Sequence, residues 1–321
     1  MIHPPDEILQ ILRQAERVLI AAHVFPDGDA LGSQLALGNA LESAGKEVYL
    51  YSEEPVSDIL EFMPGSERLI SRLPDDDDFD CAVSLDCGDK RRLGINADDL
   101  LRHKPFIAID HHAGHQFFAD HTWVDAQRSS TGEMIYDLLR CLDYEISKDT
   151  AYCLYTAILT DTGSFKYEST TSHTMRVAAD LLDYGIQPAE ICGHIFDNYS
   201  TNRLYLLQAV LGTLSMHADD QIAFISVTRQ MLEATGTVST DTELFINFPR
   251  SLRSVKVAVF LKETGNDLVG VSMRAKGEVD VAQVARSFGG GGHRNAAGFK
   301  VPVISLTTLR HQLLDRLLPL V

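Results

Sequence analysis

The sequence VLIAAHVFPDGD, residues 18–29, joins a short and wholly apolar run to one histidine and two aspartates. The apolar run, 18–22, is typical of a strand that is buried on both faces of a parallel sheet. Pro26 and Gly28 predict a tight turn after this strand. Helical periodicity follows over 31–44 and ends at Gly45. This succession of strand, turn and helix predicts an α/β fold.

The same pattern continues through the first half of the chain and changes near residue 190. We expect an N-terminal parallel-sheet domain at 1–190 with helices on both faces, a linker helix within 191–215, and a smaller α/β domain with a mixed sheet at 216–321. The strands expected in the first domain are 18–22, 47–51, 81–85 and 106–109. The elements expected after residue 190 are a helix at 201–214, strands at 221–227, 255–262 and 268–274, a hairpin turn at 264–267 and a helix at 279–288.

Composition limits the classes of partner. The 321 residues carry a formal charge of −17, distributed as −19 over residues 1–190 and +2 over residues 191–321. A protein that coats long DNA needs a basic surface, so this acidity argues against that class. No apolar run approaches the ~20 residues of a membrane span, and we expect a cytoplasmic protein. The acidic run at 74–80 is interpreted as a solvated loop.

Several of the apolar runs end in side chains that can bind a metal. His23, Asp27 and Asp29 follow the first strand, and Asp86 follows the run at 81–85. The carboxyl ends of parallel strands converge on one crevice, so we expect these groups to meet. An aspartate at a strand end can instead cap a helix, but coincidence at three strands favours a shared site. The remaining candidates are Asp110, His111 and His112 after the run at 106–109, and Asp161 after a helical stretch.

The charge of this set matches two divalent cations. Four aspartates supply −4, and two histidines act as neutral donors. Oxygen and imidazole ligands without thiolates favour Mn²⁺ or Mg²⁺. Two such cations can activate water and stabilise an in-line displacement at phosphorus, which predicts a metal-dependent phosphoesterase. The aspartates are Asp27, Asp29, Asp86 and Asp161, and the histidines are His23 and His111.

These motifs resemble those of the DHH phosphoesterase superfamily. The matching residues are His23, Asp27 and Asp29 in H-x-x-x-D-x-D, Asp86, the triplet Asp110-His111-His112, and Asp161 in TDTG. The sequence GGGGHRNAAG at 289–298 is similar to the glycine-rich signature of the DHH-associated C-terminal domain. The resemblance implies a two-domain enzyme with its active site in the interdomain cleft.

The resemblance also implies a role for each metal-site residue. His23 and Asp27 would bind one cation, and Asp86 would bridge the pair. The second cation would be bound by Asp29, His111 and Asp161. Asp110 would orient the neighbouring imidazoles. His112 would face the substrate as a phosphate-binding group or general acid.

Candidate substrate-binding residues come mainly from the second half of the chain. Ser272 and Arg274 resemble a substrate-facing pair of the family, and Arg92 resembles an arginine that follows the second motif, with Arg91 as a close rival. The glycine run could be a flexible linker or an anion-binding nest. The stretch RSSTGE at 128–133 also resembles the family, although Ser129 or Ser130 could simply cap a helix. The remaining candidates are Gly290, Gly291, Gly292, His293 and Arg294.

The resemblance is strongest to the group of nanoRNases and 3′-phosphoadenosine-5′-phosphate phosphatases. It implies hydrolysis of very short RNA and linear dinucleotides, such as pGpG and pApA, with Mn²⁺ as the expected metal and Mg²⁺ as the alternative. A manganese-dependent inorganic pyrophosphatase and a non-catalytic nucleotide sensor are the alternative functions. A Rossmann dehydrogenase is disfavoured because no G-x-G-x-x-G follows the first strand. The preferred substrate and the oligomeric state stay open, a homodimer being one arrangement.

Overall fold

The computed structural model of the chain describes residues 3–74, 78–264, 268–302 and 305–321. The fold divides into two compact units, Met1–Asn198 and Tyr199–Val321. The division falls within 190–215, the region in which the composition of the chain changes. The helix at Thr201–Leu211, α8, belongs to the second unit.

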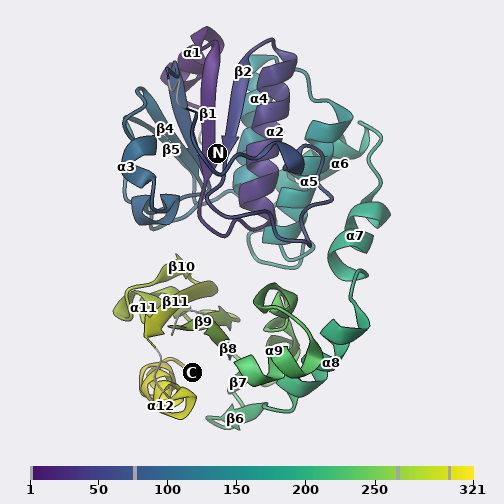
Figure 1. Cartoon of the computed structure of the whole chain (residues 1–321), viewed down its shortest axis with the longest axis vertical. Coiled ribbons are helices and arrows are strands. Elements are labelled where there is room, and N and C mark those ends of the chain that lie inside the picture. The colour runs from purple at the N-terminus through teal and green to yellow at the C-terminus, as the bar shows by residue number, and fades with distance from the viewer. Residues whose placement is uncertain (1–2, 75–77, 265–267, 303–304) are drawn as a thin grey trace. The chain divides into compact units, whose positions relative to one another are not determined.

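The first unit is built on a parallel sheet of five strands in the order β2-β1-β3-β4-β5 (Figure 1). The α/β architecture and the four predicted strands are confirmed, while β5 was not predicted. The strands are β1 (Arg17–Ala22), β2 (Glu47–Tyr51), β3 (Cys81–Leu85), β4 (Phe106–Asp110) and β5 (His121–Val124).

Helices cover this sheet. Helices α2, α4 and α5 pack against one another; α2 contacts β1 and β2, and α4 contacts β4 (Figure 1). Leu19 and Ala82 point to one face of the sheet, and Ile20 points to the other. Leu100 of α3 packs on the face that carries Leu19 and Ala82. The helices are α1 (Asp6–Gln14), α2 (Gly28–Ser43), α3 (Ala97–Leu100), α4 (Thr131–Leu142), α5 (Lys148–Asp161), α6 (Ser172–Leu182) and α7 (Pro188–Phe196), with short 3₁₀ turns at Ser66–Arg68 and Lys90–Leu93.

Two glycines allow α2 and α4 to approach α5 closely. A Cβ atom on Gly32 of α2 would lie 2.6 Å from the carbonyl oxygen of Cys153, and one on Gly132 of α4 would lie 2.5 Å from the Cβ of Ala157. Both distances are too short for real atoms, so larger residues would push the helices apart. Close packing of α2, α4 and α5 brings the polar ends of these helices together at the carboxyl ends of the strands.

The second unit has a mixed sheet in the order β10-β11-β9-β8-β7-β6, in which β7 and β8 are parallel and the other pairs antiparallel. Leu309 and Leu313 of α12 pack on one face, and Leu206 and Val210 of α8 pack on the other. The strands are β6 (Ser215–His217), β7 (Ile222–Val227), β8 (Val257–Thr264), β9 (Leu268–Ala275), β10 (Gly291–His293) and β11 (Ala296–Pro302). The other helices are α9 (Arg229–Thr235), α10 (Asn247–Ser251), α11 (Val281–Ser287) and α12 (Leu306–Leu317), with 3₁₀ turns at Ser239–Thr242 and Leu318–Leu320.

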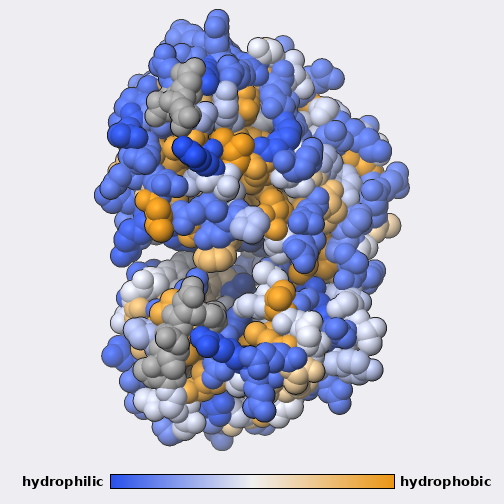
Figure 2. All heavy atoms as spheres, in the orientation of Figure 1, coloured by the Kyte–Doolittle hydropathy of each residue, from blue (hydrophilic) through white to orange (hydrophobic). Residues whose placement is uncertain are grey.

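Several smaller predictions can be compared with this fold. The glycine run is not a flexible linker, because 291–293 form strand β10. Residues 265–267 of the predicted turn at 264–267 and residues 75–77 of the acidic run at 74–80 lie outside the described residues. Within the described ranges, no helix has both the length and the apolar character to cross a bilayer. On the face shown in Figure 2, apolar residues form scattered patches among polar ones.

Candidate metal centre

The polar residues predicted to meet in the first unit do come together. His23 follows β1 directly, Asp86 follows β3, and His111 follows β4. These three strands are neighbours in the sheet, so their carboxyl ends lie side by side. Asp29 lies in the first turn of α2, and Asp161 is the last residue of α5. The sheet and two of the helices that cover it therefore all supply side chains to one site.

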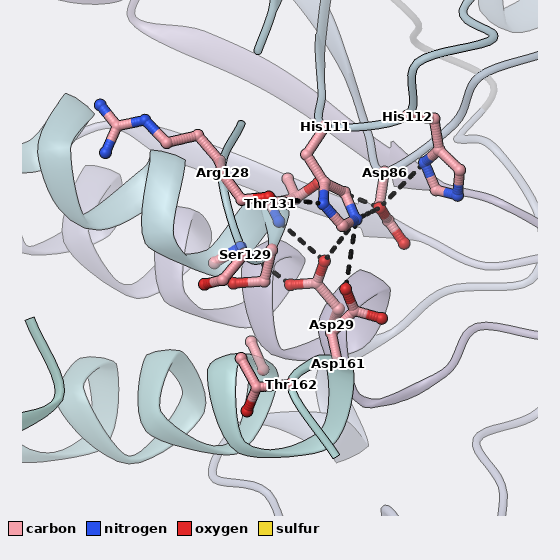
Figure 3. A network of polar contacts seen from close by, with 12 residues as sticks. Asp29, Asp86, His111, His112, Arg128, Ser129, Thr131, Asp161 and Thr162 are labelled. Atoms are coloured by element: carbon pink, nitrogen blue, oxygen red, sulfur yellow. Dashed lines mark hydrogen bonds and ion pairs between the residues drawn. The ribbon is translucent and has the colours of Figure 1, made fainter. Parts of the chain in front are cut away.

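One group of donors surrounds the His111 imidazole. Its Nε2 atom lies 3.6 Å from Oδ2 of Asp29, 3.5 Å from Oδ1 of Asp86 and 3.4 Å from Oδ2 of Asp161 (Figure 3). One donor atom from each of Asp29, His111 and Asp161 lies within 4.8 Å of the others, which is close enough to share an ion. The arrangement is a candidate cation site built from imidazole and carboxylate ligands.

A second group of donors surrounds the His23 imidazole. Its Nε2 atom lies 3.9 Å from Oδ2 of Asp27 and 3.5 Å from Oδ2 of Asp86. The two oxygens of Asp86 therefore face different histidines, because Oδ1 is the atom near His111. A carboxylate in this position can contact two cations at once.

Asp27 shows that capping and ligation are compatible. It is the N-cap of α2, and its Oδ1 atom accepts hydrogen bonds from the N–H groups of Asp29 and Ala30, each at 3.1 Å. Its other oxygen is the one that faces His23. From the sequence, helix capping and metal binding are alternative roles for an aspartate at a strand end. Here the single carboxylate of Asp27 can fill both roles.

The hydrogen bonds of the two histidines fix which nitrogen faces the carboxylates. The Nδ1 atom of His23 lies 2.9 Å from the carbonyl oxygen of Val24, and that of His111 lies 3.3 Å from the carbonyl oxygen of Arg128. Because a carbonyl can only accept, Nδ1 carries the hydrogen in both rings. In the neutral rings Nε2 then carries a lone pair and no hydrogen, and in both residues this atom faces the carboxylate groups. This is the orientation that metal-binding histidines require.

The crowding of carboxylates shifts several pKa values. Burial raises the pKa of Asp29 well above its usual range, and the nearby Asp86 adds to this shift. Burial also raises the pKa of Asp161, to about 6. For His111, burial lowers the pKa, but the charges of Asp161, Asp86 and Asp29 outweigh burial and raise it to about 10. A buried site that holds this much negative charge needs cations or protons to neutralise it.

Asp110 connects two further histidines. Its Oδ1 atom lies 2.7 Å from Nδ1 of His112, and its Oδ2 atom lies 2.8 Å from Nδ1 of His115. Burial raises the pKa of the Asp110 carboxyl, but hydrogen bonds from these imidazoles outweigh burial and lower it. His115 was missed in the sequence, because a histidine five residues after Asp110 gives no distinctive spacing.

The RSSTGE segment contacts the site more extensively than expected. Ser130 does cap α4, since its hydroxyl accepts from the N–H of Glu133 at 3.0 Å. Beyond the cap, Thr131 and Gly132 donate hydrogen bonds to the carboxylate of Asp29 (Figure 3). Thr131 was not singled out in the sequence, where RSSTGE resembled the family and a cap by Ser129 or Ser130 was the alternative. No local signal could have found it, because a threonine next to a capping serine has no distinctive spacing.

The substrate candidates of the second unit share one face of its sheet. His293 pairs with Ala296 across β10 and β11, and Ala296 pairs with Arg274 of β9. Residues paired in this way point to the same face of an antiparallel sheet. Ser272 lies on that face too, because burial alternates along β9 and both Ser272 and Arg274 belong to the less buried set. Only small residues stand between them on this face.

The remaining candidates have simpler surroundings. Gly290 and Gly292 are required by the hairpin, since a Cβ atom on either would lie within 2.4 Å of an atom of β11. Arg294 forms an ion pair with Glu278 at 2.9 Å. In the first unit, Arg91 is paired with Asp89, whereas Arg92 is exposed and its carbonyl accepts from the N–H of Val24. Gly291 is exposed and lies in β10.

Comparisons with known proteins agree with this architecture. Residues 17–158 match the DHH family, N-terminal domain, and residues 241–318 match the DHHA1 domain. A Thermus thermophilus protein named bifunctional oligoribonuclease and PAP phosphatase NrnA is 33% identical over 96% of this chain and 91% of its own length. A Bacillus subtilis protein with the same name is 24% identical over 92% of both chains.

A solved structure is similar over nearly the whole fold. The crystal structure of an exopolyphosphatase-related protein from Bacteroides fragilis has a TM-score of 0.89 and is 31% identical, over 98% of this chain and 96% of that one. The family matches span the metal-site strands of the first unit and the glycine-rich hairpin of the second. On these grounds the chain belongs to the DHH family of phosphoesterases, with an N-terminal DHH domain and a C-terminal DHHA1 domain.

Proposed function

We propose that this protein is a metal-dependent hydrolase of phosphoester bonds that degrades very short RNA and linear dinucleotides to mononucleotides and also removes a phosphate from 3′-phosphoadenosine-5′-phosphate. The observation that carries the proposal is the placement of Asp86 between two histidines, each with its own further carboxylates. The Thermus and Bacillus relatives, named for oligoribonuclease and PAP phosphatase activities, support the choice of substrates.

The fold implies divalent metal ions, and the donor set suits two of them. His23 and Asp27 would hold one ion, Asp29, His111 and Asp161 the other, and Asp86 both. Oxygen and imidazole donors are the ligands that Mn²⁺ accepts readily, and Mn²⁺ is therefore our first choice, with Mg²⁺ second. Bound cations of this kind activate a water molecule and neutralise charge on the phosphate oxygens.

His112 and Asp110 are assigned to proton transfer. The hydrogen bond from Nδ1 of His112 to Asp110 fixes the ring, and we assign its Nε2 atom to the substrate. His112 would donate a proton to the oxygen of the leaving nucleotide, and Asp110 would stabilise the charged imidazolium. Burial disfavours that charge, but the hydrogen bond to Asp110 outweighs burial and raises the pKa of His112. The ring thus favours the protonated form that a general acid needs.

The second unit is assigned to substrate binding. Ser272, Arg274 and His293 share one face of its sheet, and we propose that they bind the terminal phosphate of a short nucleotide. The further binding groups are Gly290, Gly291, Gly292 and Arg294 of the same unit and Arg92 of the first. A substrate of a few nucleotides also suits the acidic first unit, which would repel long nucleic acid.

The alternative functions have less support. An inorganic pyrophosphatase would not need groups for a ribose or base, and the full-length relatives reported above are named for nucleotide substrates. A non-catalytic sensor would be expected to have lost some ligand positions. Here every residue assigned to the two cations has a side chain that can bind metal, and each contributes to one of the converging groups.

The test is hydrolysis of a panel of substrates in Mn²⁺ by the full chain. The panel contains pApA, pGpG, RNA of two to ten nucleotides, 3′-phosphoadenosine-5′-phosphate and inorganic pyrophosphate. We expect turnover of the dinucleotides and little turnover of pyrophosphate. The Asp86→Ala variant should lose both bound metals and all turnover, with its circular dichroism unchanged. Preferred hydrolysis of pyrophosphate, or full activity of Asp86→Ala, would contradict the proposal.

A further inference from the structure

Thr131 contacts two of the carboxylates assigned to metal binding. Its hydroxyl lies 3.0 Å from Oδ1 of Asp86, and its backbone N–H lies 2.7 Å from Oδ2 of Asp29 (Figure 3). The next residue, Gly132, donates its N–H to Oδ1 of Asp29 at 2.8 Å. We propose that Thr131 is a positioning residue that fixes the Asp86 and Asp29 carboxylates for cation binding. The proposal rests on the proposed function, because it assumes the same metal centre.

The Asp86 carboxylate needs such a contact. Its backbone has φ of 55°, a left-handed conformation, and the residue follows the last position of β3. One oxygen must face His23 and the other must face His111, so the carboxylate plane must keep one particular orientation. A hydroxyl that donates to Oδ1 fixes that rotation and leaves the second lone pair of Oδ1 and both lone pairs of Oδ2 for cations.

Capping of α4 does not explain the Thr131 hydroxyl. The N-cap is Ser130, whose hydroxyl accepts from the N–H of Glu133. At the first position of a helix, the backbone and not the side chain makes the helical hydrogen bonds. A valine would therefore support α4 about as well as Thr131 does. The Thr131 side chain is fully buried, and a buried hydroxyl is costly unless it is hydrogen-bonded. Its partner is the Asp86 carboxylate.

The segment that carries Thr131 is itself held rigidly. The guanidinium of Arg128 is buried and forms ion pairs with Asp125, Glu133 and Asp137 at 3.3, 3.0 and 2.6 Å. Glu133 also accepts a hydrogen bond from the hydroxyl of Thr174 in α6 at 2.8 Å. Buried and mutually satisfied networks of this kind are rigid. A donor fixed by such a network can orient a carboxylate before any ion arrives.

The segment supports a third metal-site residue as well. The carbonyl of Arg128 accepts from Nδ1 of His111 at 3.3 Å and so directs Nε2 of that ring toward the carboxylates. One short stretch, 128–132, therefore contacts Asp29, Asp86 and His111 together. Loss of the Thr131 hydroxyl removes one of these contacts and leaves the backbone contacts in place, which makes it a specific probe.

The test compares Thr131→Val with Thr131→Ser in the full-length protein, with Mn²⁺ binding measured by titration calorimetry. Valine keeps the shape and removes the donor, whereas serine keeps the donor. Loss of an indirect support to a metal ligand typically weakens binding by ~10- to 100-fold, and we expect that loss for valine. Serine should remain within about threefold of wild type. The hydrolysis rate of Thr131→Val should recover as the Mn²⁺ concentration is raised.

Unfolding of the metal-free variants separates positioning from folding. We expect Thr131→Val to unfold at a temperature close to that of the metal-free wild type, and to gain less from added Mn²⁺. If valine does not fold, Thr131→Ala replaces it in the comparison with serine. The proposal would be overturned if the variant without a hydroxyl bound Mn²⁺ with wild-type affinity. It would also be overturned if the Mn²⁺ affinity of both variants fell equally. If the hydroxyl proves necessary for Mn²⁺ binding while the wild type hydrolyses no dinucleotide, the proposed function fails and the positioning role stands.

Discussion

His112 differs from the two histidines assigned to metal binding in the partner of its Nδ1 atom. His23 and His111 each donate from Nδ1 to a backbone carbonyl, whereas His112 donates to the Asp110 carboxylate. A carbonyl fixes the orientation of a neutral ring, while a carboxylate also stabilises the ring when it carries a proton. This difference separates rings suited to hold a metal from the ring suited to transfer a proton.

The first prediction follows from this difference. His112→Gln should keep its metals but lose turnover by ~10²- to 10⁴-fold, the usual contribution of a general acid. The matched variant His111→Gln should instead lose metal, because it removes an Nε2 donor that faces three carboxylates. Metal content by mass spectrometry and turnover of pApA distinguish the two. Loss of metal in His112→Gln with a harmless His111→Gln would mean that the two roles are exchanged.

The second prediction concerns the proton on His111. The pKa of about 10 means that this ring is protonated at pH 7 in the metal-free protein, because the carboxylates around it favour the charged form. Mn²⁺ must displace that proton, so its affinity should rise by ~tenfold per pH unit from pH 7 to 9 and fall as the pH is lowered. Below about pH 6 the slope should steepen, since burial raises the pKa of Asp161 to about 6.

Calorimetry at several pH values, in buffers with different ionisation enthalpies, measures both the affinity and the protons released. We expect about one proton per ion bound at this site at pH 7 to 8. His121→Gln serves as the control, because His121 lies on β5 and its imidazole pairs with Glu7, away from the metal ligands. An affinity that does not change between pH 7 and 9 would contradict the raised pKa.

At the scale of elements, the metal site depends on how closely α2 and α4 approach α5. The third prediction is that Gly32→Ala destabilises the first unit by about 1 to 3 kcal/mol, the usual cost of overpacking. The added methyl group would meet the backbone oxygen of Cys153, which cannot rotate away as a side chain could. Trp123 is the single tryptophan of the chain and is buried in this unit, so its fluorescence during urea denaturation reports the loss.

Gly193→Ala is the matched control for this substitution. Gly193 also lies within a helix, α7, but a Cβ atom there would meet nothing within 4 Å apart from its chain neighbours and the backbone of its own helix. Alanine at such a position should be neutral or should stabilise the protein by up to about 1 kcal/mol, since glycine disfavours helix. Similar effects of the two substitutions would show that the approach of α2 to α5 is not limited by Gly32.

The sequence predicted some elements better than others, for physical reasons. Strands β2 and β3 begin and end at the predicted residues, and β3 is buried along its whole length, as its apolar run predicted. Strand β5 escaped prediction, since its sequence HTWV is short and half polar and it lies at the edge of the sheet. Strands β10 and β11 were not predicted either, because glycines and alanines do not give the alternation of apolar and polar residues that indicates a strand. There the hairpin forms through backbone pairing and close approach.

The site shows the same contrast. The converging aspartates and histidines could be predicted because each stands at the end of a recognisable strand or helix. The support given by Thr131 and His115 could not, since each depends on contacts across the fold rather than on local spacing. A threonine beside a helix cap resembles many others in sequence, and only the position of α4 next to Asp86 distinguishes it.

At the scale of the whole molecule, the two units differ in charge. Residues 1–198 carry −20, and residues 199–321 carry +3. The first unit places Asp27, Asp29, Asp86 and Asp161 where cations would bind, and its acidity leaves little to attract a nucleic acid of many phosphates. We therefore assign recognition of the terminal phosphate to the second unit, where Arg274 and His293 share one face of the sheet.

The last prediction tests that division of roles. Arg274→Ala should reduce kcat/KM for pApA by an amount typical of a charged hydrogen bond, ~1.5 to 3 kcal/mol, because it removes a cationic donor proposed to bind the terminal phosphate. A small activated phosphodiester has no terminal phosphate and should be hydrolysed at nearly the wild-type rate. Mn²⁺ affinity should not change, since Arg274 belongs to the second unit and the proposed metal ligands belong to the first.

Arg286→Ala is the control for this variant. Arg286 belongs to the same unit and pairs with Asp280 on the surface, so its loss changes the charge of the unit equally without altering the face that carries Arg274. If charge alone attracted the substrate, both variants would weaken pApA hydrolysis alike and salt would abolish the difference. If Arg274 binds the terminal phosphate, only its own variant loses activity, and the loss is confined to substrates that carry that phosphate. Equal losses on pApA and on the small phosphodiester would refute this assignment, because they would place the effect of Arg274 on the reaction itself.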